Sequence, residues 1–348
     1  MRPIRSFAVV CSSGEPLDPI YWFSSLSASL PNSAPVTSTP PKILITAPIP
    51  PDLRAALAQR YTVVDRAELP GWPQQPAPGF AVAVTTSMSG IDAAMFDALP
   101  DLRIVLCQGA GTDRLDLAGA RRLGIAVAYT PDELADDVGE AAIAMIYAVM
   151  RRVAEADRFV RAGRWGRERM APSVRVAGKA VGIVGLGRIG RRVAQLAEGI
   201  GMTVMYHGRR PANAPYPFVA DLHQLAAQSD VLVLSCPGGD ATRHIIDMSV
   251  LERLGSKGFL VNVSRGSVVD EAALIAALQT GVIAGAALDV FASEPNPDPR
   301  IIALENVVLQ PHSTSITHET RAAMIARLLG DLDCFLHGRP FYDAAARV

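Results

Sequence analysis

One short glycine-rich segment limits what this chain can fold into more than any other part of the sequence. The apolar run Ala180–Val184 leads directly into Gly185-Leu-Gly187-Arg-Ile-Gly190, and a helix-like stretch follows. The first glycine permits a tight turn, the second lets a pyrophosphate approach the backbone, and the third lets helix pack on strand. The phosphates then lie at a helix N-terminus, which favours negative charge. The pattern alone is weak because flexible turns also produce it, but its strand-and-helix context predicts a dinucleotide-binding crossover.

The end of the next predicted strand, Met202–Tyr206, indicates which dinucleotide this crossover binds. About 20 residues past the first glycine, an NAD-binding fold usually has an Asp or Glu for the ribose 2′-hydroxyl. This chain has Gly208, Arg209 and Arg210 there instead. No carboxylate repels a 2′-phosphate at this point, and two guanidiniums can bind one bidentately. The alternative is a pair of solvated surface arginines. We favour NADP(H) as the cofactor, with NAD(H) as the second choice.

Composition excludes several classes of function. The 348 residues suffice for two ordinary domains, and 49% hydrophobic with 19% charged residues is typical of a well-packed soluble protein. A net charge of −1 gives no indication of a nucleic-acid or membrane partner. The four cysteines are widely spread without metal-ligand spacing, so we expect no metal site and a cytoplasmic, reducing location. No apolar run is long enough to span a bilayer.

The rest of the chain alternates between predicted strands and helices. Residues 1–41 are rich in Ser and Pro, and we expect a disordered extension there, or a start codon placed too early. A first set of strands is predicted at 42–46, 61–64, 80–85, 103–107 and 125–128, and a second at 180–184, 202–206, 231–235, 258–263, 284–288 and 307–310. One long helix over Glu140–Arg161 separates the two sets. The prediction is therefore an α/β fold of two doubly wound parallel sheets with a cleft between them.

Three polar residues each follow a strand of the second set. They are Arg265, Glu294 and His312. An open parallel sheet gathers its active site at the carboxyl ends of its strands. A guanidinium can hold a carboxylate and polarise the adjacent carbonyl, while an imidazole oriented by a carboxylate can give up a proton near neutral pH. Each residue alone is more often structural, but the combination suits reduction of a 2-oxo acid.

From about Lys42 onward the sequence resembles the D-isomer-specific 2-hydroxyacid dehydrogenases. Besides the glycine segment, the matching stretches are Gly109–Asp113, Tyr129–Asp132, Asn262–Asp270, Leu288–Pro295 and Gln310–Ser315. Within that family the chain is most similar to NADPH-preferring hydroxypyruvate/glyoxylate and hydroxyphenylpyruvate reductases. The features that carry this are Tyr206-His-Gly-Arg-Arg210, Pro215–Phe218 and the His-Glu-Thr-Arg segment that begins at His318.

The resemblance implies a role for each matching residue. Arg265 would bind the substrate carboxylate and carbonyl, His312 would donate the proton, and Glu294 would be its partner. The substrate carboxylate would also meet the backbone N–H groups of Ala110 and Gly111. The cofactor contacts implied are Gly185, Leu186, Gly187, Arg188, Ile189, Gly190, Gly208, Arg209, Arg210, Cys236, Pro237, Val263, Asp289, His312 and Ser315, with Asp289 at the nicotinamide carboxamide. Further candidates for the pocket are Ile49, Met88, Trp165 and Met170.

The resemblance also implies a division into domains and a homodimer. Residues 42–131 and 318–348 would form a flavodoxin-like substrate-binding domain, and residues 132–317 a Rossmann domain for NADP. Closure would occur about hinges near Thr130–Pro131 and Ile316–Thr317. The loop with Trp165 would reach a neighbouring subunit, although an ordinary core or surface tryptophan is an equal alternative.

The chain departs from the family pattern at two places. Thr314 follows His312-Ser where relatives often have His-Ile-Gly, which sets a bulkier side chain beside the nicotinamide. Gly238 and Gly239 follow Pro237 where Leu-Thr is usual. Neither change affects Arg265, Glu294 or His312, so the departures bear on cofactor contacts only.

The predicted reaction is NADPH-dependent reduction of a small 2-oxo acid to the D-2-hydroxy acid, with His312 as general acid. Glyoxylate, hydroxypyruvate and an aryl-pyruvate are the candidate substrates. Two other functions stay open: a dinucleotide-sensing binding protein of the corepressor type, and a dehydrogenase of the same fold for another acid such as formate or phosphite.

Overall fold

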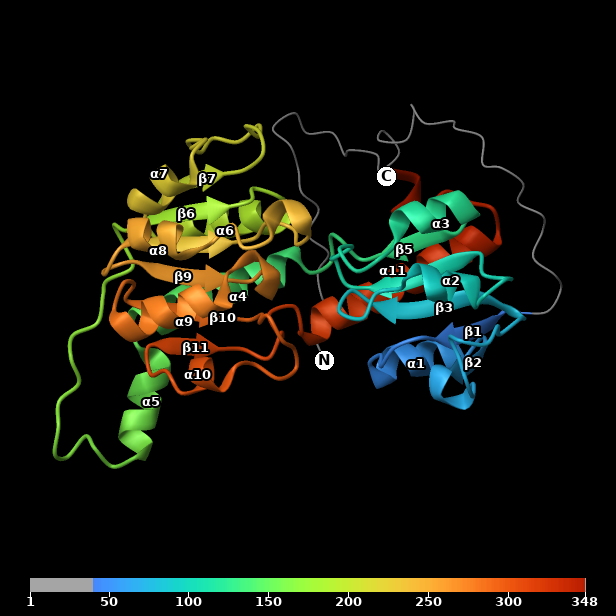
Figure 1. Ribbon diagram of the computed structural model, residues 1–348, viewed down its shortest axis with the longest axis horizontal. Coiled ribbons are helices and arrows are strands. Elements are labelled where there is room, and N and C mark those ends of the chain that lie inside the picture. The colour runs from blue at the N-terminus through green and yellow to red at the C-terminus, as the bar shows by residue number, and fades with distance from the viewer. Residues whose placement is uncertain (1–39, 348) are drawn as a thin grey trace, which may run out of the picture.

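A computed structural model of the chain describes residues 40–347. Two parallel sheets lie side by side, each covered by helices on both faces (Figure 1). The predictions for Cys11 and, apart from residues 40 and 41, for the N-terminal extension lie outside the described residues.

The smaller sheet has the strand order β2-β1-β3-β4-β5, and all its strand pairs are parallel. Its strands are β1 (Lys42–Ile45), β2 (Thr62–Asp65), β3 (Phe80–Thr86), β4 (Ile104–Gln108) and β5 (Ala126–Tyr129). Alternate residues of β4 enter two different cores, because successive side chains point to opposite faces. One core is closed by α1 (Pro51–Ala58) and α11 (His318–Leu336), and the other by α2 (Ala93–Asp97) and α3 (Leu117–Leu123).

The larger sheet has the order β11-β10-β9-β8-β6-β7, again with parallel pairs throughout. Its strands are β6 (Ala180–Val184), β7 (Thr203–His207), β8 (Val231–Leu234), β9 (Phe259–Asn262), β10 (Gly285–Leu288) and β11 (Val307–Leu309). Val184 pairs with His207 on one side and Leu234 on the other. The chain order therefore reverses between β6 and β8, which is where ligands bind in open α/β sheets.

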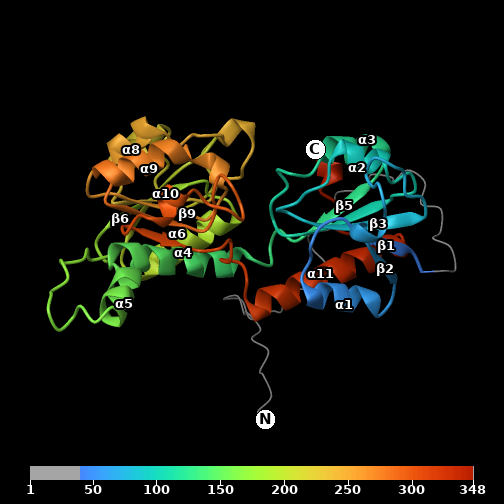
Figure 2. The same ribbon diagram turned by 60° about the horizontal axis from the view of Figure 1, so that its bottom comes forward.

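Helices cover both faces of the larger sheet. On one face lie α4 (Ala135–Met150) and α6 (Arg188–Gly199), and on the other α7 (Leu222–Ala227), α8 (Met248–Leu254) and α9 (Glu271–Thr280). Figure 2 shows α4 on the same side of the molecule as α1 and α11. Strands β8 and β9 are buried along their whole length because both of their faces are covered. The short α10 (Pro299–Ile302) precedes the edge strand β11.

The predicted fold class is confirmed, and one predicted helix is wrong. All eleven predicted strands occur within residues 40–347, and no strand end differs from its predicted position by more than one residue. The single helix expected over Glu140–Arg161 is instead α4 followed by α5 (Val153–Arg161). Arg152 between them has a φ of 54°. Helix α4 ends at Met150 because the carbonyl of Met150 accepts a hydrogen bond from the Val174 N–H, at 2.9 Å. This bond anchors the returning loop at the end of the helix.

The chain passes between the two halves twice, and the two passages are fastened together. Asp137 in α4 accepts hydrogen bonds from the hydroxyls of Thr317 and Thr320, at the start of α11. Arg327 of α11 reaches back to Glu133, with 3.1 Å between Nη1 and Oε1. Thr320 is buried, so these bonds satisfy a hydroxyl that water does not reach. The division into domains at residues 131/132 and 317/318 stays a prediction.

Within residues 40–347, none of the helices combines the length and the apolar character needed to cross a membrane.

Candidate active site

The glycine-rich segment forms the turn between β6 and α6. Gly185 has a φ of 97°, and a Cβ atom there would lie 2.6 Å from the Cα of Cys236. A Cβ at Gly190 would lie 2.1 Å from the carbonyl oxygen of Gly185. A Cβ at Gly187 would meet nothing within 4 Å, and no side chain caps the helix that begins there. The turn thus leaves open space in front of uncapped N–H groups at a helix N-terminus, which fits a dinucleotide pyrophosphate.

Arg209 and Arg210 follow β7 next to this turn. The N–H of Gly185 donates to the carbonyl of His207 at 2.9 Å, which fixes the end of β7 beside the glycine segment. Both arginines are exposed, and no ion pair to either guanidinium occurs in the described part of the chain. They are therefore free to meet an anionic group on a bound nucleotide.

The remaining predicted cofactor residues lie at the ends of successive strands of the same sheet. Cys236 and Pro237 follow β8, Val263 follows β9 and Asp289 follows β10. Burial raises the pKa of the Cys236 thiol to about 11, so this side chain is a neutral, apolar wall. These residues therefore form a line of strand ends along one edge of the larger sheet.

His312 and Glu294 form a hydrogen-bonded pair. Nδ1 of His312 lies 2.9 Å from Oε2 of Glu294, and their side chains are 22% and 17% exposed. The other carboxylate oxygen, Oε1, accepts from the Phe291 N–H at 2.9 Å. Burial acts to raise the pKa of Glu294, but the bonds from His312 and Phe291 and the charges of His312 and Arg265 outweigh it and hold the pKa below its usual value. Glu294 is thus an ionised partner that fixes one ring nitrogen of His312 and leaves Nε2 for a substrate.

The loop that carries His312 is held by Asp289. The φ of His312 is 53°, and its N–H donates to the Asp289 carbonyl at 2.9 Å. The buried Asp289 carboxylate accepts from the Ser313 N–H at 2.8 Å and from the Thr314 hydroxyl at 2.6 Å. Asp289 was predicted to face the nicotinamide carboxamide, and that role stays a prediction.

Arg265 comes from the loop after β9 and meets the other half of the molecule. Its Nη1 donates to the Ser264 carbonyl at 2.9 Å, and its Nε lies 3.1 Å from Oδ1 of Asp113, in the loop after β4. A Cβ at Gly111 would lie 1.5 Å from Nη2. Within residues 40–347, neither the Ala110 nor the Gly111 N–H donates to a protein acceptor. These N–H groups and the guanidinium can therefore bind one carboxylate together.

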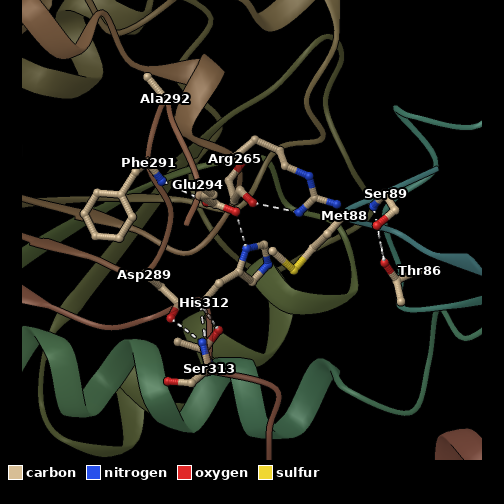
Figure 3. A network of polar contacts seen from close by, with 12 residues as sticks. Thr86, Met88, Ser89, Arg265, Asp289, Phe291, Ala292, Glu294, His312 and Ser313 are labelled. Atoms are coloured by element: carbon tan, nitrogen blue, oxygen red, sulfur yellow. Dashed lines mark hydrogen bonds and ion pairs between the residues drawn. The ribbon is translucent and has the colours of Figure 1, made fainter. Parts of the chain in front are cut away.

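The structure brings some predicted residues together and separates others. Arg265, Glu294 and His312 point into one space, and Met88 extends into it from the loop after β3 (Figure 3). The loop after α5, with Trp165 and Met170, lies on the side of the larger sheet away from the other half (Figure 1). Sequence reasoning assigned no role to Asp113, although it stood within a matching stretch. Its place in the loop that follows β4 was the other signal available.

Comparison with known proteins identifies the family of this site. A family profile described as "D-isomer specific 2-hydroxyacid dehydrogenase, NAD binding domain" matches residues 143–314. The chain is 44% identical to a glyoxylate/hydroxypyruvate reductase A of Arabidopsis thaliana over 260 residues, which are 74% of this chain and 82% of the relative. This chain belongs to the D-isomer specific 2-hydroxyacid dehydrogenase family. It is an oxidoreductase.

Other members of the family show the same breadth of match. A hydroxyphenylpyruvate reductase of Plectranthus scutellarioides is 42% identical, with 76% of this chain and 85% of the relative covered. A 2-ketogluconate reductase of Gluconobacter oxydans is 41% identical, with 85% and 95% covered. The crystal structure of an NADPH-dependent glyoxylate/hydroxypyruvate reductase from Sinorhizobium meliloti, in complex with NADP and malonate, has a TM-score of 0.81. It shares 34% identity over 88% of this chain and 97% of its own.

Replacing Gly190 by alanine should weaken cofactor binding in this dehydrogenase. The new Cβ would collide with the Gly185 backbone, which cannot move without shifting the turn. Overpacking costs about 1–3 kcal/mol, so we expect the Kd for NADPH to rise by roughly 10- to 100-fold. Titration of the protein with NADPH, followed by nicotinamide fluorescence, measures the change.

Gly199→Ala is the matched control. Gly199 lies in the last turn of the same helix, and a Cβ there would meet nothing within 4 Å. The Kd of Gly199→Ala for NADPH should equal that of the parent protein. Equal binding by Gly190→Ala would show that the close approach of α6 to β6 is not needed for the cofactor.

Proposed function

We propose that this protein reduces a small 2-oxo acid to the D-2-hydroxy acid with NADPH. The observation that carries the proposal is the His312–Glu294 pair beside Arg265, at the end of the line of strand ends where the dinucleotide contacts are predicted. Reductases of 2-oxo acids among the relatives support the substrate class.

Each residue of the site has a defined task in this reaction. Arg265 and the Ala110 and Gly111 N–H groups bind the substrate carboxylate, and Arg265 polarises the neighbouring carbonyl. The hydride for the carbonyl carbon would come from the reduced nicotinamide of the cofactor when it is bound. His312, held through Nδ1 by Glu294, gives the proton on Nε2 to the developing alkoxide. Ionised Glu294 stabilises the positive charge of the imidazole before the transfer.

The two arginines after β7 support NADP(H) as the preferred cofactor. Exposed, uncompensated guanidiniums next to the glycine turn suit a ribose 2′-phosphate, and no carboxylate stands there to repel it. The S. meliloti structure was solved with NADP, which fits the same choice.

Free thiols support a reducing compartment such as the cytoplasm. Cys107, Cys236 and Cys334 carry no disulfide in the described residues.

The first test is the rate of NADPH and NADH oxidation with a panel of 2-oxo acids. The panel is glyoxylate, hydroxypyruvate, 4-hydroxyphenylpyruvate and 2-ketogluconate, chosen from the names of the relatives. We expect turnover with NADPH favoured, and the ranking defines the preferred side chain. Absence of turnover with every acid would contradict the proposal and favour a binding protein or a dehydrogenase for formate or phosphite.

Replacing both Arg209 and Arg210 by alanine should remove the preference for NADPH. Losing charge-assisted hydrogen bonds to a phosphate costs about 1.5–3 kcal/mol, so the KM for NADPH should rise by about 10- to 100-fold. The KM for NADH should change less than about twofold, because NADH lacks the 2′-phosphate. Arg122→Ala, an exposed arginine on α3, is the control and should change neither value. A parallel loss for both cofactors would refute a contact with the 2′-phosphate.

Glu294→Gln should alter the pH dependence of reduction. The lowered pKa of Glu294 keeps its carboxylate ionised at neutral pH. In the parent protein, kcat/KM should fall as the pH drops through this lowered pKa and Glu294 takes up a proton. Glutamine has no charge to lose, so Glu294→Gln should lack this acidic limb, and its kcat/KM at neutral pH should be lower by about 10-fold or more.

Glu271→Gln is the control for that profile. Glu271 accepts from the Ala292 N–H at 2.9 Å and so supports the same loop. The acidic limb of Glu271→Gln should coincide with that of the parent protein. A Glu294→Gln profile that also coincides would mean that Glu294 does not act on His312.

We also propose that the protein is a homodimer formed through α5 and the loop after it. This segment projects from the body (Figure 1) and exposes Val153, Val160 and Trp165, at 54%, 55% and 66%.

Light scattering should give twice the mass of one chain. Val160→Ser with Trp165→Ser should raise the dimer Kd by at least about 30-fold, because aromatic anchors dominate interfaces. Leu123→Ser, an exposed apolar residue on α3, should leave the dimer intact. A parent protein with the mass of one chain would refute the proposal.

A further inference from the structure

The ion pair between Arg265 and Asp113 joins the two halves of the molecule at the candidate active site. Nε of Arg265 lies 3.1 Å and 3.3 Å from the two carboxylate oxygens of Asp113. The side chains are 24% and 17% exposed, so the pair is largely withdrawn from solvent. Asp113 follows β4 in the smaller sheet and Arg265 follows β9 in the larger one. The contact therefore exists only while the two loops are close.

The pair fixes the direction of the guanidinium. Asp113 takes the Nε edge, and the Ser264 carbonyl takes Nη1 at 2.9 Å. Nη2 is left against Gly111, where a Cβ would lie only 1.5 Å away. Nη2 thus faces the backbone segment whose N–H groups are free to bind a carboxylate.

Gly238 provides the space for this arrangement. A Cβ at position 238 would lie 2.8 Å from Cγ of Arg265 and 3.4 Å from Oδ2 of Asp113. The stem of Arg265 passes where a side chain at 238 would otherwise stand. Three loops, after β4, β8 and β9, therefore fit together around one guanidinium.

Without Asp113 the guanidinium of Arg265 can move to a position that is unfavourable for the reaction. Arginine has many rotamers, so an unheld side chain samples many positions. Glu294 is a second carboxylate near Arg265, whose charge helps to lower the pKa of Glu294, and Glu294 already binds His312. A released Arg265 is drawn toward Glu294 and competes with the imidazole for it. Asp113 prevents this by neutralising Arg265 on the opposite edge.

We propose that Asp113 is a positioning residue for Arg265. It orients the guanidinium toward the substrate carboxylate only when the two halves approach, so that the site is assembled by closure. The inference rests on the proposed function. Asp113 also adds a negative charge near an anionic substrate, so its carboxylate costs substrate affinity while its oxygen supplies orientation.

Separate variants distinguish the orientation of Arg265 from the repulsion between Asp113 and the anionic substrate. Asp113→Ala removes both, and kcat for glyoxylate with saturating NADPH should fall about 10- to 100-fold, as expected when a catalytic group is misplaced by about 1 Å. Asp113→Asn keeps an oxygen that accepts from Nε, so kcat should stay within about threefold and the KM for glyoxylate should not exceed that of the parent. A kcat for Asp113→Ala within about twofold of the parent value would overturn the inference.

A second background tests whether Asp113 acts through Arg265. In Arg265→Lys the ammonium lacks the Nε edge, so adding Asp113→Ala should lower kcat by no more than about threefold. A loss of equal size in both backgrounds would mean that Asp113 acts independently and would overturn the inference. Asp113→Ser replaces Asp113→Ala if the alanine variant does not fold, with the same expected loss.

Asp116→Ala is the matched control in the same loop. Asp116 caps α3 by accepting from the Gly119 N–H at 2.8 Å, so its loss lowers stability but should leave kcat and KM unchanged. A kcat lowered as far as in Asp113→Ala would show a general effect of the loop and overturn the inference. An inactive parent protein would remove the proposed function and this inference with it, whereas an active parent with an unchanged Asp113→Ala removes the inference alone.

Discussion

The buried carboxylate of Asp289 holds the loop of His312 in a backbone conformation that histidine rarely adopts. A left-handed residue other than glycine costs about 1–3 kcal/mol and persists only where its surroundings enforce it. Here the Asp289 carbonyl accepts a hydrogen bond from the His312 N–H. The Asp289 carboxylate accepts from the Ser313 and Thr314 N–H groups and from the Thr314 hydroxyl. A carboxylate has about four acceptor positions, so one stays available to a cofactor amide. The imidazole meets Glu294 because this loop cannot relax.

Parallel strands explain why so few residues suffice for the site. All strands of the larger sheet end at one edge, and each contributes one or two side chains or N–H groups there. The smaller sheet contributes Ala110 and Gly111 in the same way. Charges of opposite sign alternate across the resulting space, from Asp113 to Arg265 to Glu294, and Glu294 also holds His312. Each positive group therefore has a negative neighbour before any substrate arrives, and an incoming carboxylate needs only to join an existing network.

Sequence patterns predicted the parts of this structure that depend on local rules. The glycine turn, the strands and the residues that follow them are set by short segments, so Arg265, Glu294 and His312 could be named in advance. The Asp113–Arg265 pair joins residues 152 positions apart, and no local pattern encodes it. The break after α4 was missed for the same reason. The carbonyl of Met150 is taken by Val174, and the guanidinium of Arg152 turns to Glu155 at 2.5 Å. The hydrogen bond between Val174 and Met150 depends on a loop that returns from elsewhere in the chain.

The bonds that fasten α4 to the start of α11 limit the motions available to the enzyme. Asp137, Thr317 and Thr320 hold both passages of the chain at one place, and separating them would strand a buried hydroxyl at about 1–3 kcal/mol. Moving one half away from the other is therefore disfavoured, and so is sliding α4 past the start of α11. Rotation about an axis through this point keeps every one of these bonds. Such a rotation can widen the space between Arg265 and the Ala110–Gly111 segment for entry of substrate and release of product, while α4 and the start of α11 stay at a constant distance.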